Sequence, residues 1–547
     1  MSAIRGSRRL LAGAAGTAAL ALVLTACGGG SGGSGDGDGG GSAESLIVGT
    51  TDKVTSLDPA GAYDNGSLTV ALQVYPFLMN NPYGSSDVKP DIAESAEFTS
   101  PTEYTVKIKP GLKWANGHDL TSSDVKFSFD RVLKIKADNG PWSLLANLDS
   151  VETPDDTTAV FHLKNPDDQT FPQVLSTSAG PIVDEEVFSP DELTPDQEIV
   201  DANAFAGQYT ITGYKLNELV SYEAYDGYQG LNGPAKTPKI NVKYFTDASN
   251  LKLEVQDGSV DVAFRSLSPT DIEDLGKDDS VQVVKGPGGE IRYITFNFNT
   301  QPYGTKQPDA DPKKALAVRQ AVADLIDRQA IADQVYKGTY SPLYSFVPDG
   351  LTGATQPLKE LYGDGQGGPD AAKAKKTLED AGVTTPVELD LQYSNDHYGP
   401  SSGDEYALLK DQLESDGLFK VNLQTTEWVQ YSKDRVEDKY PAYQLGWFPD
   451  YSDADNYLTP FFAEGNFLDN NYSNPAVDKL IKQQTSTADA DERTQLIEQI
   501  QADEAKDLST VPYLQGDQIA IAGKDVTGVK DTLDASFKFR YAALAKG

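Results

Sequence analysis

Hydrophobic and polar positions alternate with two different periods along most of the chain. Apolar residues at every second position predict half-buried strands, most clearly at residues 104–109, 219–223, 292–299 and 387–393. Apolar residues three or four positions apart predict helices, most regularly at residues 311–338. Because predicted helices and strands alternate through the sequence, we expect an α/β fold.

The segment at residues 311–338 predicts two consecutive helices. Pro312 fits the first turn of one helix, and Asp327 can cap the next. Arg319 and Arg328 lie on these helices, and we expect them to form surface or structural ion pairs rather than ligand contacts. Further along, residues 477–505 are also expected to be helical.

Residues 111–133 combine a tight turn with the start of a helix. Asn116 and Gly117 are typical of a two-residue turn. Thr121 is a suitable N-cap, and Asp124 stands at the third helical position of a capping box. Apolar residues then recur on one helical face, so this stretch is expected to pack into a core.

The same stretch resembles the signature region of the extracellular solute-binding proteins of family 5. These include the oligopeptide, dipeptide and nickel-binding receptors of ABC importers. The matching residues are Gly111, Trp114, Gly117, Leu120, Thr121, Asp124, Val125, Phe127, Ser128 and Phe129. Residues 318–328 are similar to a second signature of the family. The resemblance implies a type II periplasmic-binding-protein-like fold of the large peptide-binding class, with two lobes, a hinge and an extra subdomain.

The length of the chain agrees with several lobes. About 500 residues follow the N-terminal segment, which is more than one hydrophobic core usually covers. The resemblance implies the following parts: lobe 1 from residues 44–62, 180–290 and 512–547, an extra subdomain from residues 63–179 packed on lobe 1, and lobe 2 from residues 291–511. The strand at residues 292–299 is expected to cross the hinge.

Residues 1–26 predict an export signal, because basic residues precede a short apolar run. Cys27 is the only cysteine, which excludes a disulfide within the chain. It resembles the lipidated cysteine of a bacterial lipobox; the alternative is an ordinary secretory signal with an incidental cysteine. Arg8 and Arg9 leave both general secretion and the twin-arginine route open. Residues 27–43 then predict a lipidated cysteine with a flexible Gly/Ser linker.

Composition limits the partners and the compartment. The net charge is −36 and the acidic residues are spread along the chain, which argues against nucleic acid and favours a solvated surface outside the cell. The three histidines, His118, His162 and His397, have no recognisable metal-ligand spacing. We therefore expect no metal site and no cofactor. The lipobox resemblance implies that the lipid on Cys27 anchors the protein to the outer face of the cell membrane, and we expect a monomer.

The candidate site lies at residues 444–458, where a strand-like run breaks at Pro449 and carboxylates follow. Aromatic rings beside several carboxylates, on a turn after a strand, suit a cleft that receives a cationic group with an apolar body. An ordinary surface turn is the alternative, because Asp, Ser, Asn and Pro also form turns. The candidate ligand-binding residues are Trp428, Gly446, Trp447, Phe448, Asp450, Tyr451 and Asp453.

The resemblance adds roles to this site. In peptide-binding relatives, a glycine-aromatic run lines the cleft and a nearby aspartate receives the α-ammonium group of the ligand; Gly446, Trp447 and Asp450 match. Asp453 is a second candidate for the charge role. Pro449 departs from the pattern, because it removes one N–H from any backbone ladder with a peptide.

The expected function is a substrate-binding lipoprotein of an ABC importer, which captures a solute between two lobes and delivers it to the membrane permease. A short peptide is the first candidate, and an opine, an oligosaccharide or a metal chelate is the alternative. The chain has no GxSxG elbow, HExxH motif, P-loop or catalytic cysteine. A hydrolase that uses paired carboxylates remains a rival, as does an adhesion or signalling lipoprotein.

Overall fold

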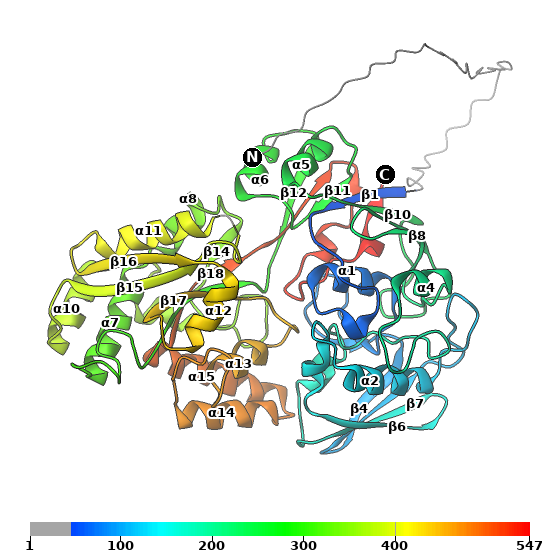
Figure 1. Ribbon diagram of the computed structural model, residues 1–547, viewed down its shortest axis with the longest axis horizontal. Helices are drawn as coiled ribbons and strands as arrows, with labels where there is room; N and C mark the ends of the chain where they lie inside the picture. The colour runs from blue at the N-terminus through cyan, green and yellow to red at the C-terminus, as the bar shows by residue number, and fades with distance from the viewer. Residues whose placement is uncertain (1–44, 400) are drawn as a thin grey trace, which may run out of the picture. The chain divides into compact units, whose positions relative to one another are not determined.

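The computed structural model describes residues 45–399 and 401–547. The predicted signal segment, Cys27 and the Gly/Ser linker therefore lie outside the described residues. Two large sheets and one smaller sheet organise the described part (Figure 1). The mixed sheets and their helices confirm the expected α/β class with two lobes.

A seven-stranded sheet is built from segments that are far apart in the sequence. Its central strand β1 pairs in parallel with β10 and β11, and the other pairs are antiparallel. The strand order is β12 (Val281–Gly286), β19 (Gln518–Gly523), β11 (Val262–Phe264), β1 (Ser45–Thr50), β10 (Lys239–Tyr244), β9 (Leu219–Ala224) and β8 (Tyr209–Lys215). Helices α1 (Asn65–Val74), α4 (Asp196–Asp201), α5 (Ala248–Gln256) and α6 (Pro269–Leu275) pack beside it.

A four-stranded antiparallel sheet lies next to the residues that resemble the family signature, which occupy the loop after β5 (Glu103–Ile108) and helix α2 (Ser122–Ile135). The order of the sheet is β4 (Ala93–Ser100), β5, β7 (Thr158–Leu163) and β6 (Leu148–Asp155), with α2 packed against it. The predicted capping box is confirmed: the Thr121 hydroxyl accepts from the Ser123 N–H, and the Asp124 carboxylate accepts from the Thr121 N–H at 2.8 Å. Val125 and Phe129 are buried, so this stretch builds a core, as expected.

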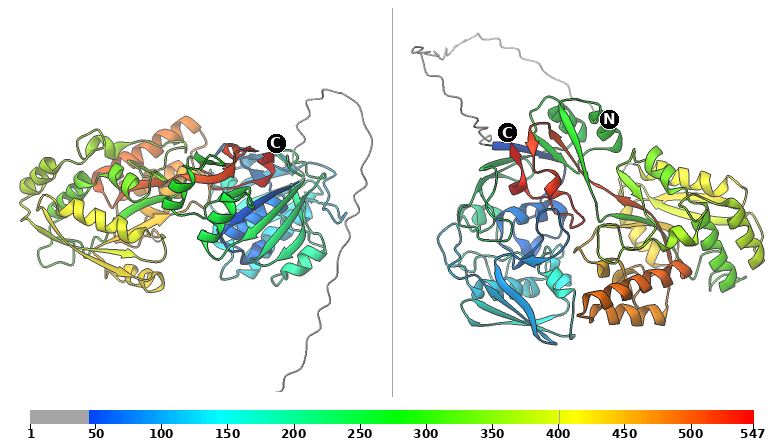
Figure 2. Two further views of the ribbon diagram at one scale, coloured as in Figure 1. Left: turned by 90° about the horizontal axis from the view of Figure 1, so that it is seen from above. Right: turned by 180° about the vertical axis from the view of Figure 1, so that it is seen from behind.

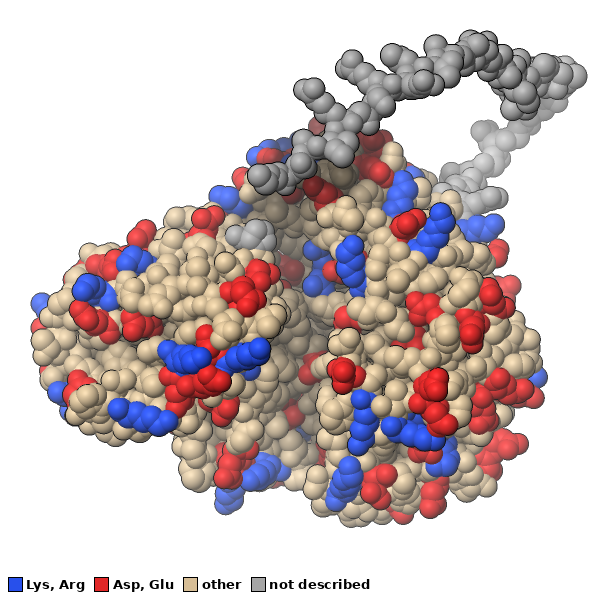
Figure 3. Space-filling model, viewed as in Figure 1, with Lys and Arg blue, Asp and Glu red and all other residues tan. Residues whose placement is uncertain are grey.

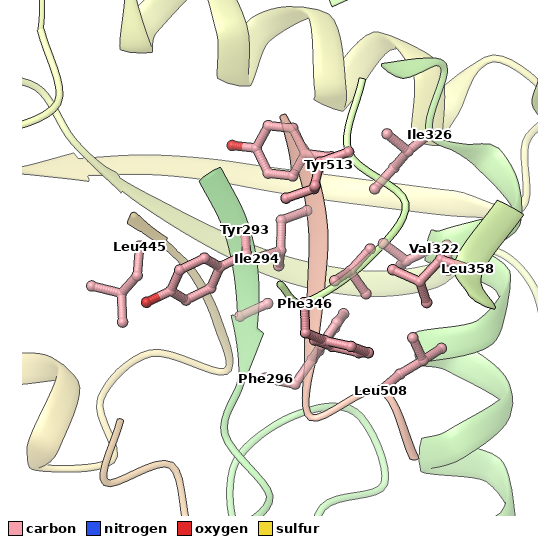
Figure 4. Packing of buried hydrophobic residues seen from close by; sticks show 14 of the residues in the cluster. Tyr293, Ile294, Phe296, Val322, Ile326, Phe346, Leu358, Leu445, Leu508 and Tyr513 are labelled. Atoms are coloured by element: carbon pink, nitrogen blue, oxygen red, sulfur yellow. The ribbon is translucent and has the colours of Figure 1, made fainter. Parts of the chain in front are cut away.

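A six-stranded mixed sheet forms the other large layer. Its order is β14 (Tyr340–Pro342), β18 (Thr510–Gly516), β13 (Ile291–Phe296), β17 (Ala442–Trp447), β15 (Val387–Ser394) and β16 (Phe419–Thr426). The helices of this part are α7 (Pro312–Leu325), α8 (Arg328–Gln334), α9 (Pro357–Leu361), α10 (Ala371–Ala381), α11 (Ser402–Glu414), α12 (Trp428–Val436), α13 (Thr459–Phe462), α14 (Pro475–Thr485) and α15 (Ala490–Asp507). Figure 4 shows part of the core beneath the sheet, where Tyr293, Phe346 and Tyr513 pack with aliphatic side chains.

One short helix and two short strand pairs lie outside these three sheets. They are α3 (Phe171–Val174), β2 (Met79–Asn80) paired with β3 (Lys89–Pro90), and β20 (Val526–Thr527) paired with β21 (Ala545–Lys546). Within the residues that the structure describes, no helix is both long enough and apolar enough to cross a membrane.

Two segments cross between the large sheets, one from β12 to β13 and one from β18 to β19 (Figure 2). The two crossings touch. The Gln515 side-chain amide donates to the Gly288 carbonyl at 2.7 Å, and the Gly516 N–H donates to the Glu290 carbonyl at 2.9 Å. A Cβ on Gly288 would collide with the Gly516 carbonyl, so only glycine permits this approach.

The sequence placed the return of the chain to lobe 1 at position 512. In the structure this second crossing lies later, between β18 and β19. Strand β18 pairs with β13 and β14 in the six-stranded sheet, and β19 is the strand that joins the seven-stranded sheet. Residues of β18 are buried throughout, and such an apolar run does not indicate which sheet it enters. Pro512 is accommodated by a register shift between Arg292 and Tyr293 on β13.

The region predicted as one helix at residues 477–505 forms two, α14 and α15. The Ser486 and Thr487 hydroxyls donate to carbonyls of the last turn of α14, and Asp489 caps α15 by accepting from the Glu492 N–H at 2.9 Å. Short polar side chains that bond the local backbone favour helix ends over helix interiors. The apolar periodicity continues across the break, which is why the sequence did not reveal it.

The expectation of ion pairs for Arg319 and Arg328 is wrong, although both residues are structural. Each guanidinium is buried and bonds backbone carbonyls: Arg319 donates to the Asp507 carbonyl at 2.8 Å, and Arg328 donates to the Leu343 carbonyl at 2.9 Å. Among the described residues, neither forms an ion pair. Both arginines therefore join segments of the core.

Glu504 on α15 is a buried carboxyl with an acidic neighbour. Its oxygens contact the hydroxyls of Tyr472 and Ser509, and the Tyr472 hydroxyl also lies 2.8 Å from the Asp507 carboxylate. Burial raises the pKa of Glu504 from 4.5 to about 8. At neutral pH Glu504 is therefore protonated, and it can donate to the Tyr472 oxygen while Tyr472 donates to Asp507.

We expect Glu504→Gln to change how stability depends on pH. Because the pKa is higher in the folded protein than in the unfolded chain, the contribution of Glu504 is fully present below pH 4.5 and is lost as pH rises to about 8. Between these two pH values the free energy of unfolding falls by about 1.4 kcal/mol per pH unit. The glutamine variant should flatten this slope and be more stable than the parent at pH 8, as measured by urea unfolding at several pH values.

The matched control is Glu498→Gln, which alters an exposed glutamate on the same helix. This control should keep the parent's pH slope. If Glu504→Gln and Glu498→Gln gave the same slope as the parent, Glu504 would not be the group that takes up the proton.

Candidate functional site

A cavity of about 450 Å³ lies between segments that belong to the two large sheets. From the seven-stranded sheet, its lining includes Arg265 after β11, residues of α6 and the buried loop that carries Phe537. From the six-stranded sheet, it includes Arg292, Tyr340 and Phe448. The face drawn in Figure 3 is hollowed between these two parts, and acidic side chains are spread over it rather than gathered in one patch.

Phe448 brings the predicted stretch to this cavity. It follows the last residue of β17, and its ring packs on Phe537 with centroids 5.7 Å apart. The guanidinium of Arg265 lies 4.2 Å from the Phe537 ring centroid and 5.7 Å from that of Phe448. The cavity therefore has an aromatic wall with one cation against it.

The charges on the six-stranded side of the cavity are already matched. Arg292 is buried and pairs with Glu290 at 2.6 Å. The Tyr340 hydroxyl donates to Glu290 at 2.7 Å, and Arg292 donates to the Tyr398 carbonyl at 3.0 Å. This network fixes the wall of the cavity and leaves Glu290 without a free charge for a ligand.

Asp450 lies two residues beyond Phe448 and is half-buried. The Tyr63 hydroxyl donates to its carboxylate, and the Asn456 amide donates to it at 3.3 Å. Burial raises the pKa of Asp450, and the bonds from Tyr63 and Asn456 oppose that rise. In the described part of the chain no cation pairs with Asp450, and its side chain is not among those that line the cavity.

Asp453 has a different environment. Its two oxygens accept from Arg493 at 2.7 and 2.8 Å, and it also caps the turn by accepting from the Asp455 N–H. It lines a second cavity of about 310 Å³, together with Arg493. Because Arg493 already neutralises Asp453, the geometry favours Asp450 over Asp453 for the charge role.

The other predicted residues lie around the cavity at different depths. Gly446 is buried in β17, where a Cβ would press on Tyr398 and on the Ile291 carbonyl at 3.0 Å. The Trp447 indole donates to Asn456 at 2.9 Å, and its ring packs edge-on against Phe461. These two residues therefore hold the strand and the turn, and they do not line the cavity.

Tyr451 and Trp428 do not line the cavity either. The Tyr451 hydroxyl donates to Asp455 at 3.1 Å, and burial raises the pKa of Asp455 to about 6. Trp428 begins α12, and its ring stacks on that of His397 with centroids 3.6 Å apart. His397 itself lines the cavity. Loss of solvent and the charge of Arg292 lower the pKa of His397 to about 4, so this ring is neutral at pH 7.

Sequence reasoning missed three residues of the site, Tyr63, Arg265 and Phe537. Arg265 directly follows the apolar strand β11, and a charged residue at the end of a buried strand is the one signal that could have identified it. Tyr63 and Phe537 lie in loops without a motif. Among residues 45–399 and 401–547, no group of His, Cys, Asp and Glu side chains is arranged to hold a metal ion.

The comparisons with known proteins cover most of the chain. The model of the bacterial extracellular solute-binding proteins, family 5, matches residues 87–469. The chain is 26% identical to heme-binding protein A of Haemophilus influenzae, over 78% of this chain and 79% of that protein, and 24% identical to the dipeptide-binding protein of Escherichia coli, over 79% and 81%.

The structural comparison agrees with this assignment. The structure of HbpA2 from Haemophilus parasuis superposes with a TM-score of 0.77 at 21% identity, covering 92% of this chain and all of that one. This likeness supports the two-lobe fold, and the matched family model spans both the signature region and the predicted site at β17. The chain therefore belongs to family 5 of the bacterial extracellular solute-binding proteins.

Proposed function

We propose that this protein captures a short peptide between its two lobes and delivers it, chemically unchanged, to the permease of an ABC importer. One observation carries the choice of ligand. Asp450 is a half-buried carboxylate without a cationic partner among the described residues; it does not itself line the cavity, but it follows Phe448, which does, by two positions. A carboxylate next to aromatic rings suits an ammonium group attached to an apolar body.

The backbone beyond β17 is poorly suited to pair with a peptide strand. Pro449 has no N–H, and the Asp450 N–H already donates to the Asn456 side chain at 2.9 Å. Side chains rather than a continuous backbone ladder should therefore hold the ligand. Specificity would then depend on the charged ends of the peptide more than on its length.

The contact between Tyr63 and Asp450 links capture to lobe position. Tyr63 precedes α1, whereas Asp450 follows β17, so their hydrogen bond joins the two halves of the protein. A ligand that binds better when the lobes are together shifts the protein towards that state by its differential affinity. Hinge closure around a ligand is an established mode of motion for two-domain proteins.

Cys27 gives the proposed attachment. A lipid on this cysteine, followed by the Gly/Ser linker, would hold the binding lobes near the outer face of the membrane while leaving them free to reorient. Metabolic labelling with a fatty-acid probe should mark the parent protein and should not mark Cys27→Ser. Equal labelling of both proteins would exclude Cys27 as the lipid site.

The test of function begins with the natural ligand. We expect mass spectrometry of the denatured native protein to release peptides with free amino groups, and scattering to show a more compact particle when such a peptide is added. Released opines, oligosaccharides or metal chelates would replace the peptide assignment. Formation of a cleavage product from the added peptide would contradict a binding function and would indicate a hydrolase.

The raised pKa of Asp450 predicts a pH dependence of binding. An ammonium group binds the ionised carboxylate, so affinity should fall as pH drops and Asp450 takes up a proton. Because burial raises its pKa above 3.8, this loss should begin at a higher pH than for an exposed aspartate. Calorimetry between pH 7 and pH 4 measures it, and Asp450→Asn should bind weakly with little change over the same range.

A further inference from the structure

One side of the aromatic wall is carried by a segment without regular secondary structure. This Phe537 segment, residues 533–540, lies between the short helical turns Lys530–Thr532 and Tyr541–Ala543. All of its residues are buried except Phe537, which is half-buried and lines the cavity. The backbone of Phe537 is left-handed, with φ of 62°, which a phenylalanine adopts only where surrounding contacts impose it. The contacts that hold this segment therefore determine where the aromatic ring lies.

Two buried cations follow Phe537 in this segment, and each is bound by an asparagine. The Lys538 ammonium donates to the Asn81 side-chain oxygen at 2.7 Å, and the Arg540 guanidinium donates to the Asn80 side-chain oxygen at 2.8 Å. All four residues are buried, and among the described residues neither cation forms an ion pair. A buried cation costs free energy unless it is hydrogen-bonded, so positions of the segment that break these contacts are disfavoured.

These cations are poorly suited to stabilise the fold. The Nε and Nη1 atoms of Arg540 are buried and have no acceptor in the described part of the chain. Burial, together with the charge of Arg540, lowers the pKa of Lys538 well below its usual value. Burying charge contributes little to stability, because the loss of solvent offsets the contacts made. Their place next to the cavity wall therefore indicates a role in shaping the site.

The two asparagines come from a distant part of the chain. Asn80 ends β2, whose Met79 packs in the same hydrophobic core as the four-stranded sheet and α2, and Asn81 directly follows. Asn81 is itself held in place, because its amide donates to the carbonyls of Ser86 and Asp87 at 2.7 and 3.1 Å. The part of the protein that contains the four-stranded sheet thus reaches the segment that forms the cavity wall.

The other end of the Phe537 segment packs against the first crossing between the large sheets. A Cβ on Gly286 would lie 2.3 Å from the Leu533 carbonyl oxygen, and one on Gly289 would lie 3.0 Å from the Ala535 carbonyl oxygen. Phe537 is therefore held between contacts to the crossing on one side and the asparagine contacts on the other.

We propose that Asn80 and Asn81 are positioning residues of the ligand site, which hold Phe537 in the cavity through Lys538 and Arg540. This inference rests on the proposed function and deepens it, because it gives the part with the four-stranded sheet a role in ligand selectivity. A peptide with an aromatic side chain can pack on the Phe537 ring, whereas a peptide of alanines cannot. Loosening the segment should therefore reduce the preference for the aromatic peptide.

The binding experiment compares Ala-Phe-Ala with Ala-Ala-Ala by calorimetry on the full chain. We expect the parent to prefer the aromatic peptide by about 3-fold to 10-fold, as is typical of an aromatic pair. Lys538→Met should reduce this preference to about twofold or less, and Asn81→Ser, which removes the acceptor instead of the donor, should do the same. Adding Lys538→Met to Phe537→Leu should not change the preference further, because the lysine acts through Phe537.

Hydrogen exchange provides a second measurement, which needs no ligand. The Phe537 N–H donates to the Asp534 carbonyl at 3.3 Å, and the Arg540 N–H donates to the Thr532 hydroxyl at 2.7 Å. These amides should exchange about tenfold faster in Lys538→Met and in Asn81→Ser than in the parent. The melting temperature of Lys538→Met should stay close to that of the parent, because the variant removes a buried charge. A purely structural role predicts the reverse, a lower melting temperature with an unchanged preference.

Lys524→Met is the matched control. Lys524 is an exposed lysine in the turn between β19 and β20, and it does not line the cavity. This variant should keep both the parent's preference for the aromatic peptide and the parent's exchange rates at residues 533–540.

The outcomes separate this proposal from peptide capture. Equal binding of the two peptides by the parent, an unchanged preference in Lys538→Met and Asn81→Ser, or unchanged exchange of the segment overturns the positioning role and leaves peptide capture in place. Equal losses for both peptides in Lys538→Met also overturn it. If the parent bound neither peptide, peptide capture would fail, and the exchange rates of the two variants would decide the positioning role.

Discussion

Asp450→Ala is expected to weaken the binding of a free-amine peptide by about 100-fold, because truncating one partner of a buried charge pair costs about 2–5 kcal/mol. Most of that loss is the penalty for leaving the ligand's ammonium group in the cleft without an anion. Tyr63 cannot replace the carboxylate, since its hydroxyl carries no charge at neutral pH. Calorimetry with one peptide on the parent and the variant measures the effect.

Two controls make this result specific to charge recognition. Asp138→Ala removes an exposed aspartate in the loop after α2, and it should leave the affinity unchanged. Acetylation of the peptide's amino end should weaken binding to the parent and have little further effect on Asp450→Ala. If the parent bound the acetylated and free peptides equally, Asp450 would have no role in holding the amino group.

Asp58→Ala is expected to be the most destabilising single change, at about 3–5 kcal/mol, because it leaves a buried charge without its partner. Asp58 is fully buried and accepts from Arg131 at 2.7 Å, and it also accepts from the Thr194 and Ala60 N–H groups. Arg131 remains inside the protein after the change, where it can still donate to the Ser189 carbonyl. Urea unfolding at pH 7 measures the loss.

Helix α2, which carries Arg131, provides the comparison. Asp130 pairs with Lys126 on the exposed side of α2, and Asp130→Ala should change stability by less than about 1 kcal/mol. The double variant Asp58→Ala with Arg131→Met should be more stable than Asp58→Ala alone, since it removes the stranded charge. A double variant that is less stable than Asp58→Ala would contradict this explanation.

Local patterns predicted the elements of this fold well where a short stretch of sequence carries the full signal. The capping box at Thr121 and Asp124 formed as predicted, and Asp327 caps α8. These features depend on neighbours within a few positions, which the sequence displays directly. Helix ends in long polar–apolar stretches were less visible, as the break between α14 and α15 shows.

The candidate site was only partly visible in the sequence, because its chemistry depends on contacts between distant segments. Asp450 and Asp453 look alike in the sequence, but Arg493 neutralises only Asp453. The position of Arg265 after a buried strand is a weak signal in the sequence, and only the fold shows that its guanidinium lies against Phe537 and Phe448. In the same way, no local feature of the sequence indicates that Arg319 will reach the Asp507 carbonyl, and an ion pair was expected instead.

The contact between Gly288 and Gly516 restricts how the halves of the molecule can reorient. The two connecting segments are held together by the bonds of Gln515 to Gly288 and of Gly516 to Glu290, so neither can swivel while the other stays still. They should therefore move together as one two-stranded ribbon, and the two halves should open by a change in the twist of this ribbon. Any side chain in place of Gly288 would act as a wedge in that ribbon and bias its resting angle.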